Sequence, residues 1–556
     1  MAAILYLGNQ ATTHTWQSCA LLLSVDKDHR TLAKMVTRLT PFDPRGAFRA
    51  SADGQALRRL AVRGAVVTVL SSGSGLAIQI GSAVALARLL APRDFGLIAM
   101  VSTFSLVLSN FGLNGFTEAI LQRTELDRAL ANNIFWISVG SGLLLTVGFS
   151  QSGLLLARFY HSSLVTPVAT WMSLTILVSS ISVVHLALLK RAMLFSSLAA
   201  NDFCSRVSSI IVSIVLAWAG CRHWALVAGA VAQPLTQCIG AWMLCRWKPG
   251  APRRSNGTAS TIRFAAHVYG RFVVNYFTRN VDNLIVGSQF GSEALGFYKR
   301  AYDLFALSTS QLTSPLTNVA VAALSRFSPS SLEYRHFLRR ALATLAFVGM
   351  GIAMNLALIG NDLIRVLLGL GWETSGRIFS FFAPGIGVMV VYYVHGWIHL
   401  SIGRPERWLI WEVVEVTVTC LLFVLALPWG PVGIAAAWTA AFWVLTIPAF
   451  WYAGRPIGLG VKVALGTVWR YLVASIVAFW ACEALGQAFP FLRGLLGVPW
   501  ALLRIAMTSV LFGVVYLGAV VVLHRGNGPI RDAAQLLKEM KFLRKNSQPG
   551  AGVAAA

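Results

Sequence analysis

The sequence predicts an all-α polytopic membrane protein with about 14 transmembrane helices, arranged as two parallel six-helix lobes followed by two C-terminal helices. Three observations predict this class. Apolar side chains make up 56% of the chain and charged ones 12%. Apolar runs long enough to cross about 30 Å of hydrocarbon recur along most of its length. The sequence also resembles itself at a separation of about 200 residues.

The composition excludes an ordinary soluble protein. Soluble domains carry roughly 45–50% apolar and about 25% charged residues, and the mean hydropathy here is +0.66. The 46 Lys and Arg exceed the 21 Asp and Glu by 25 formal charges. Because loops on the cytoplasmic side of membrane proteins collect Lys and Arg, this excess indicates topology, and we expect no nucleic-acid partner. The seven cysteines lie far apart, so we expect no disulfide framework, metal site or other cofactor.

The apolar runs predict the individual spans, because each covers about the 17–25 residues that a transmembrane helix needs. In chain order, they are residues 64–90, 95–121, 133–157, 165–189, 202–220, 224–246, 262–288, 293–325, 341–368, 375–401, 407–428, 431–453, 462–486 and 498–523.

Loop charge predicts the orientation. If the chain starts in the cytoplasm, the loops on that side hold far more Lys and Arg than the opposite loops, as the positive-inside rule requires. An even number of spans then places both termini in the cytoplasm. Residues 526–556 are predicted to be a cytoplasmic tail whose first part has apolar residues at helical spacing.

Residues 1–63 are the least apolar part of the chain and carry many arginines. The apolar run around Cys19 is too short to span a membrane and has the wrong flanks for a signal peptide. We expect a basic, disordered cytoplasmic extension; a start codon assigned too far upstream is an equally good explanation.

The internal repeat predicts the lobes. Residues 89–97 (LLAPRDFGL) match 289–297 (QFGSEALGF), and two weaker pairs follow in order, 154–159 with 362–367 and 224–229 with 432–437. Each repeat would contain six helices, an even number, so both repeats would cross the membrane in the same direction. In transporters built from such parallel repeats, the substrate site lies at the interface between them. We therefore expect an N-lobe at 64–260 (helices 1–6), a C-lobe at 261–456 (helices 7–12) and helices 13–14 at 457–525, which favours an alternating-access transporter.

Polar residues at membrane depth are candidate functional residues, because each is costly there. Spacings of four, four and three residues would put four polar side chains, from Arg271 to Asp282, on one face of the seventh span. Two cations lie near the start of the eighth span. Because cations exceed anions in this set, we expect an anionic substrate, with arginines clamping phosphate oxygens. The predicted substrate-binding residues are Arg271, Asn275, Arg279, Asp282, Lys299 and Arg300.

Purely structural ion pairs are the competing interpretation, with Arg279–Asp282, Lys299–Asp303 and Asp202–Arg206 joining helices. A second group of carboxylates would bind a coupling proton or Na⁺, since a lone buried carboxylate suits a proton carrier. These candidates are Glu118, Glu412, Glu415 and Asp303. Asp282, His395 and His399 are further candidates for binding the coupling ion, although we interpret the two histidines as hydrogen-bonded residues of helix packing rather than as a relay.

Three segments resemble bacterial polysaccharide flippases of the Wzx type, in the branch similar to colanic acid exporters. They are residues 86–100 (LARLLAPRDFGLIAM), 275–287 (NYFTRNVDNLIVG) and 294–302 (ALGFYKRAY). The resemblance covers about residues 58–490 and places the chain in the multidrug/oligosaccharidyl-lipid/polysaccharide exporter superfamily. Arg279 and Asp282 fall where this branch shows an Arg and an Asp, whereas many relatives are less basic at Lys299 and Arg300.

The resemblance implies a flippase for undecaprenyl-diphosphate-linked repeat units in exopolysaccharide or lipopolysaccharide synthesis, not an enzyme. It implies ion-gradient coupling by H⁺ or Na⁺, residence among the lipids of the bacterial inner membrane, and polysaccharide assembly machinery as a partner. One alternative is a multidrug or peptidoglycan-precursor exporter of the same superfamily. The other is a membrane polysaccharide polymerase, which would need a large external loop with catalytic groups.

Overall fold

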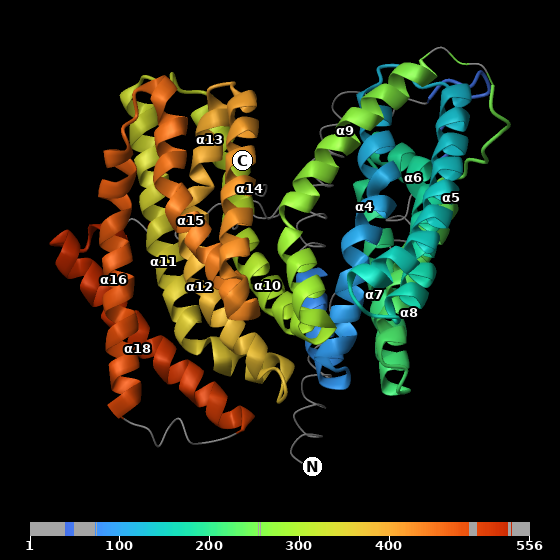
Figure 1. Ribbon diagram of the computed structural model, residues 1–556. Helices are drawn as coiled ribbons and strands as arrows, with labels where there is room; N and C mark the ends of the chain where they lie inside the picture. Colours follow the sequence, from blue (N-terminus) through green and yellow to red (C-terminus); the bar gives the residue numbers. More distant parts are fainter. Residues whose placement is uncertain are drawn as a thin grey trace, which may run out of the picture. The chain divides into compact units, whose positions relative to one another are not determined.

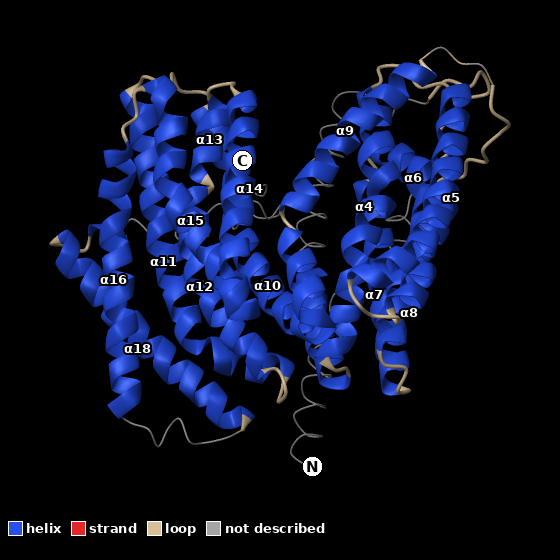
Figure 2. Ribbon diagram, viewed as in Figure 1, coloured by secondary structure: helices blue, strands red, loops and turns tan. Residues whose placement is uncertain are grey.

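The computed structural model describes residues 39–48, 73, 75–253, 255, 257–488, 497–531 and 535. Throughout this described part the chain is helical, apart from loops and three isolated β-bridges (Figure 2). The predicted all-α polytopic membrane fold is confirmed. Residues 1–38 and 49–63, the start of the first predicted span, and most of the C-terminal tail lie outside the described residues.

Two compact units make up the chain. Unit 1 contains residues 1–82, 104–154 and 166–275, and unit 2 contains residues 83–103, 155–165 and 276–556. The lobes predicted at 64–260 and 261–456 stay a prediction, because neither unit is one continuous stretch of chain. Both α4 and α5 divide between the units, so each unit is described by itself below.

Unit 1 contains most of the helices from the first half of the chain, and in Figure 1 they lie side by side in blue to green. Its helices are the start of the segment at 75–89, α4 (Pro92–Gln122) from Phe104, α5 (Arg128–Phe159) up to Leu154, α6 (Val165–Arg191), α7 (Phe195–Trp218), α8 (His223–Leu244) and α9 (Thr258–Thr278) up to Asn275.

Unit 2 contains α10 and all later helices, together with the start of α4. Its helices are α10 (Val281–Leu324), α11 (Leu332–Leu368), α12 (Glu373–Tyr392), α13 (Val394–Ser401), α14 (Pro405–Ala426), α15 (Gly430–Gly454), α16 (Val461–Ala488) and α18 (Val498–His524). Short 3-10 turns follow α14 (Leu427–Trp429) and α15 (Arg455–Ile457). Helix α12 packs against α10, α11 and α15, whereas α16 and α18 pack against α11 and each other.

Nine helical segments of the described part are long and apolar enough to cross a membrane. One of them, Pro405–Ile457, contains two predicted spans, and α8, α9 and α10 are not among the nine. Helix α10 contains a bend at Gly291, whose φ of 80° is a conformation that glycine adopts without strain. This bend lies between the predicted spans 262–288 and 293–325.

Residues 39–48 correct the expectation that the whole N-terminal segment is disordered. Backbone hydrogen bonds join Leu39 N to Leu244 O (2.8 Å) and Phe48 N to Leu126 O (3.1 Å). Apolar side chains of this segment pack against the buried core of unit 1. The basic composition obscured this order, because a few apolar residues and backbone hydrogen bonds suffice to attach ten residues to a preformed helix end.

Two arginines in loops that the charge pattern predicts to be cytoplasmic, Arg123 and Arg191, also bind backbone carbonyls next to helices of unit 1. Arg191 donates to the carbonyl oxygens of Ile120 (2.6 Å) and Thr124 (3.0 Å) at the end of α4. Arg123 donates to the carbonyl oxygen of Gly257 (2.7 Å). The last carbonyls of a helix lack intrahelical partners, so Arg191 stabilises the end of α4, whereas Arg123 binds the carbonyl that precedes the first residue of α9.

A close helix crossing in unit 2 joins the two segments that match in the sequence, at Gly96 and Gly296. A Cβ atom added at Gly96 would lie 1.6 Å from the carbonyl oxygen of Ser292, and one added at Gly296 would lie 1.9 Å from that of Pro92. Only glycine lets two helix backbones approach this closely. The repeat-related glycines therefore determine how the beginning of α4 packs on α10.

We predict that Gly96→Ala lowers the free energy of unfolding by about 3 kcal/mol or more, because the new methyl group overlaps backbone atoms that cannot rotate away. Thermal unfolding of the purified protein in detergent measures this loss. Gly148→Ala on α5 is the matched control, since nothing lies within 4 Å of its added Cβ. Equal melting temperatures for the two variants would contradict the prediction.

Candidate functional site

The predicted polar face of the seventh span is interrupted in the structure. Helix α9 ends at Thr278, Arg279 and Asn280 form a turn, and α10 begins at Val281. Asn283 Nδ2 donates to Asn280 Oδ1 (3.0 Å). Asn and Asp side chains of this kind compete with helical hydrogen bonds, which explains the interruption.

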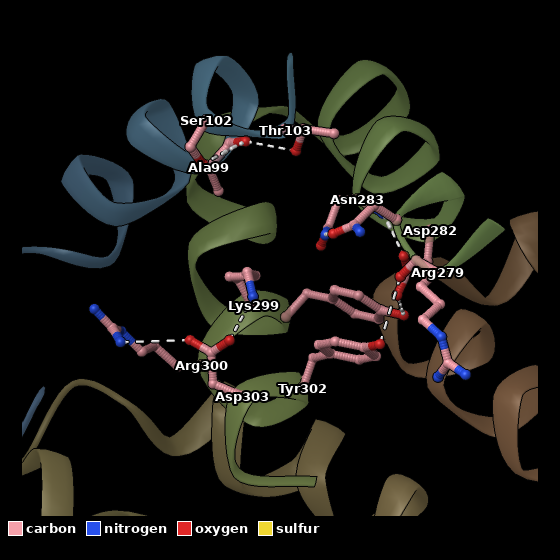
Figure 3. Close-up of polar contacts among 12 residues, drawn as sticks. Ala99, Ser102, Thr103, Arg279, Asp282, Asn283, Lys299, Arg300, Tyr302 and Asp303 are labelled. Carbon is pink, nitrogen blue, oxygen red and sulfur yellow. Dashed lines mark hydrogen bonds and ion pairs between the residues drawn. The ribbon is translucent and has the colours of Figure 1, made fainter. Parts of the chain in front are cut away.

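This interruption corrects the expectation that four polar residues share one continuous helical face. Arg271 and Asn275 are exposed side chains near the end of α9 and belong to unit 1. Arg279 and Asp282 belong to unit 2. The polar cluster of unit 2 is therefore described from residue 279 onward (Figure 3).

Asp282 is the buried centre of this cluster. Its side chain is completely buried. Its carboxylate accepts hydrogen bonds from Tyr298 Oη (2.8 Å), Trp438 Nε1 (2.9 Å) and the backbone N–H of Asn283 (2.9 Å). Hydrogen bonds to a charged acceptor are stronger than neutral ones, so Asp282 joins both parts of α10 to α15 through these three contacts.

Arg279 extends from the turn before α10. The side chain is exposed, and its Nη1 donates to Tyr393 Oη (3.2 Å) while its backbone carbonyl accepts from Tyr302 Oη (3.4 Å). In Figure 3 the guanidinium points away from the Lys299–Asp303 pair. The phenol of Tyr393 is neutral, so it does not cancel the positive charge of the Arg279 guanidinium. A guanidinium carries five N–H donors, and the bond to Tyr393 uses one of them.

Lys299 and Arg300 share one carboxylate. Asp303 forms ion pairs with Lys299 and, at 3.5 Å, with Arg300 Nη1. The Arg300 guanidinium also lies 4.0 Å from the centre of the Phe95 ring, a favourable cation–π geometry. Two cations with one anion leave this part of unit 2 positively charged. Asp303, predicted as an ion-coupling residue, has two cationic partners.

The remaining carboxylates occupy different surroundings. In unit 1, Glu118 forms an ion pair with Lys190 (3.0 Å), and both side chains are about half exposed. In unit 2, Glu415 accepts a hydrogen bond from Tyr392 Oη (2.8 Å), and that phenol accepts one from Trp411 Nε1 (2.7 Å). Glu412 is half-buried on α14, three residues before Glu415.

Aromatic partners of the carboxylates were missed in the sequence. Trp438 lies 156 residues from Asp282, in the middle of a highly apolar helix. A buried Trp needs an acceptor for its N–H, so a Trp in the middle of a span indicates that a buried acceptor lies nearby. Nothing in the sequence indicates which carboxylate that acceptor belongs to.

The fold and this polar interior define a polytopic helical membrane protein of a known architecture. Superposition on the structure titled "Lipid II flippase MurJ, inward closed conformation" gives a TM-score of 0.64 at 14% identity, covering 84% of this chain and 99% of that one. An inward-facing multidrug resistance MATE family transporter of the MOP superfamily gives 0.51 at 14% identity, covering 68% and 94%. At these identities the likeness shows the fold alone.

The chain belongs to the polysaccharide biosynthesis protein family, whose model matches residues 85–376. Among relatives, it is 23% identical over 304 residues to the teichuronic acid biosynthesis protein TuaB of Bacillus subtilis, covering 54% of this chain and 62% of that protein. It is 20% identical over 322 residues to the succinoglycan biosynthesis transport protein ExoT of Rhizobium meliloti, covering 58% and 65%. The matched parts thus span less than two thirds of these relatives. The resemblance to polysaccharide flippases is confirmed at the level of the family.

We predict that Asp282→Ala lowers the free energy of unfolding by about 3 kcal/mol, because it leaves buried donors on Tyr298 and Trp438 without an acceptor. Asp282→Asn retains one acceptor oxygen and is expected to lose less. Thermal unfolding followed by tryptophan fluorescence measures both.

Asp202→Ala is the matched control, since Asp202 pairs with Arg206 at 2.8 Å on the exposed face of α7. Such i,i+4 surface pairs contribute about 0.5 kcal/mol. A loss at Asp282 no larger than the loss at Asp202 would show that Asp282 does not hold unit 2 together.

Proposed function

We propose that this protein moves lipid-linked oligosaccharides, undecaprenyl-diphosphate repeat units, across the bacterial inner membrane for exopolysaccharide or lipopolysaccharide synthesis. The observation that supports this proposal is a set of cationic side chains around the polar interior of unit 2, in a member of the polysaccharide biosynthesis protein family. Arg279, Lys299 and Arg300 form the cationic part, while Asp303 balances one of its charges.

The chemistry of the cargo matches this cluster. A diphosphate carries negative charge that is very costly in hydrocarbon. Guanidinium groups bind phosphate oxygens in a bidentate way, and a lysine adds a point charge. In this proposal Arg279 takes phosphate oxygens, Lys299 and Arg300 supply positive potential, and Asp282 fixes the turn that carries Arg279. Arg271 and Asn275 belong to unit 1 and stay predictions from the sequence.

Alternating access would move the sugar head while the lipid tail stays in the bilayer. Two compact units are the usual basis of such a cycle in helical transporters. We propose that an H⁺ or Na⁺ gradient drives the cycle through carboxylates among Glu118, Glu412, Glu415 and Asp303. Both termini then face the cytoplasm, and the polysaccharide assembly machinery receives the cargo on the outer side.

We predict that Arg279→Gln and the double variant Lys299→Gln/Arg300→Gln each slow transport at least tenfold, because losing one charge-assisted contact costs about 1.5–3 kcal/mol. Reconstituted vesicles with a fluorescent lipid-linked oligosaccharide measure the rate. Arg340→Gln, an exposed residue near the start of α11, removes the same charge elsewhere and should leave the rate unchanged. Native rates in all variants would rule out a cationic substrate site here.

A deletion strain tests the substrate class separately. Loss of surface polysaccharide with accumulation of lipid-linked repeat units supports the flippase. Normal polysaccharide with altered drug sensitivity would indicate a multidrug exporter instead. Accumulation of translocated, unpolymerised units would indicate a polymerase.

A further inference from the structure

A cavity of about 310 Å³ lies within unit 2, and its lining contains no residue of the polar cluster around Asp282. Two loops line it. One is residues 87–92, where the helical segment Gly75–Leu89 ends and α4 begins, and the other is residues 368–372, between α11 and α12. Loop charge predicts that both loops lie on the external side of the membrane. The cavity therefore lies at the end of unit 2 where transported cargo would leave.

Contacts between the two loops fix the walls of this cavity. Trp372 Nε1 donates to the carbonyl oxygen of Ala87 (2.9 Å), and Arg88 Nη2 donates to that of Val366 (2.9 Å). The indole is 2% exposed and meets the ring of Phe95 edge-on, with 5.5 Å between ring centres. Because these bonds form without a ligand, the cavity is preformed, and a ligand would lose little affinity to ordering the loops.

Backbone groups supply part of the polar surface of the cavity. Its lining is mainly polar, yet among its eleven residues the polar side chains are Arg88 and Trp372, and the indole N–H is bound to Ala87. Gly369 and Gly371 have φ of 95° and 94°, which glycine adopts without strain. A Cβ atom added at Gly371 would meet nothing within 4 Å. The glycines thus leave the backbone of the second loop uncovered by side chains.

Arg88 gives the cavity its charge. It is the ionisable side chain among the described residues that line the cavity, and it is exposed. Its bond to Val366 uses one of five N–H donors. The guanidinium of Arg191, by contrast, binds three carbonyl oxygens around the end of α4. Arg88 therefore keeps donors and a positive charge for an anionic group in the cavity.

The size and the walls of the cavity suit one sugar unit with one acidic group. Ligand sites range from about 300 to 1,000 Å³, so this one has room for a single sugar ring. Backbone N–H and C=O groups bind hydroxyls, and Leu89 and Leu370, which are 43% and 77% exposed, offer apolar surface to the C–H groups of the ring. One guanidinium matches one carboxylate in a bidentate way, whereas a diphosphate would keep uncompensated charge.

We propose that this cavity is an external binding site for one acidic sugar unit of the oligosaccharide, whose carboxylate binds Arg88. The inference rests on the proposed function and deepens it, because it names a chemical property of the cargo. The site would hold the sugar head after transport, in addition to the diphosphate site proposed at Arg279, Lys299 and Arg300.

The test measures the binding of methyl glucuronide to the purified full-length protein in detergent by isothermal titration calorimetry. Methyl glucoside is the matched ligand, since it has a hydroxymethyl group in place of the carboxylate. We predict that the glucuronide binds at least tenfold more tightly than the glucoside. Arg88→Gln should remove this difference, because glutamine can still donate to Val366 but carries no charge.

Two further variants separate the cavity from charge in general. Arg158→Gln is the matched control, since Arg158 is an exposed arginine of unit 2 at the end of α5 and is not part of the lining. It should leave glucuronide binding unchanged. Ala91→Trp keeps Arg88 but fills the cavity, so we expect it to weaken binding at least tenfold. Melting temperatures of all variants show whether each one folds.

The possible outcomes distinguish the site from the proposed function. Equal binding of the two sugars, or native glucuronide binding in folded Arg88→Gln and Ala91→Trp, would overturn the site. Inorganic phosphate that binds as tightly as the glucuronide would reject the sugar and indicate a general anion site. Glucuronide binding that depends on Arg88, without oligosaccharide movement in vesicles, would keep the site and reject the flippase. Oligosaccharide movement without any glucuronide binding would do the reverse.

Discussion

Asp282 is the interaction on which the polar interior of unit 2 depends. A carboxylate with no exposure inside apolar helices is tolerated only when several donors satisfy it, and here a phenol, an indole and a backbone N–H do so. These donors come from both parts of α10 and from α15. Their convergence fixes the turn that carries Arg279 and the ring stack that includes Tyr298 and Tyr302. The cationic groups are positioned by an anion that is itself inaccessible.

The two units use their charges differently. In unit 1, Arg123 and Arg191 bind carbonyl oxygens at helix ends, and Glu118 and Lys190 neutralise each other on a half-exposed surface. In unit 2, Asp303 pairs with Lys299 and Arg300, whereas Asp282 and Glu415 lie among tyrosines and tryptophans, whose hydroxyl and N–H groups provide partners without adding charge. Neutral partners leave a buried ion able to respond to a proton or an anion, whereas a salt bridge fixes its charge.

The helices could be predicted from the sequence because a long apolar run marks both the length of a helix and its removal from water. Their ends agree with the structure to within a few residues for α6, α15 and α18. The interruption at Arg279 and Asn280 could not be predicted from periodicity, since it depends on local side-chain hydrogen bonds. The partners of Asp282 and Glu415 could not be predicted either, because Trp438 and Trp411 look like ordinary apolar residues until the helices are packed together. The sequence indicated which atoms carry charge, but not which neutral groups surround them.

Gly96 and Gly296 occupy matching positions of the repeat and touch each other. A side chain at either position would meet backbone atoms of the other helix, Ser292 O for Gly96 and Pro92 O for Gly296. Because backbone atoms cannot rotate away, a larger residue at one position would push the two helices apart even with glycine kept at the other, so neither position compensates for a change in the other.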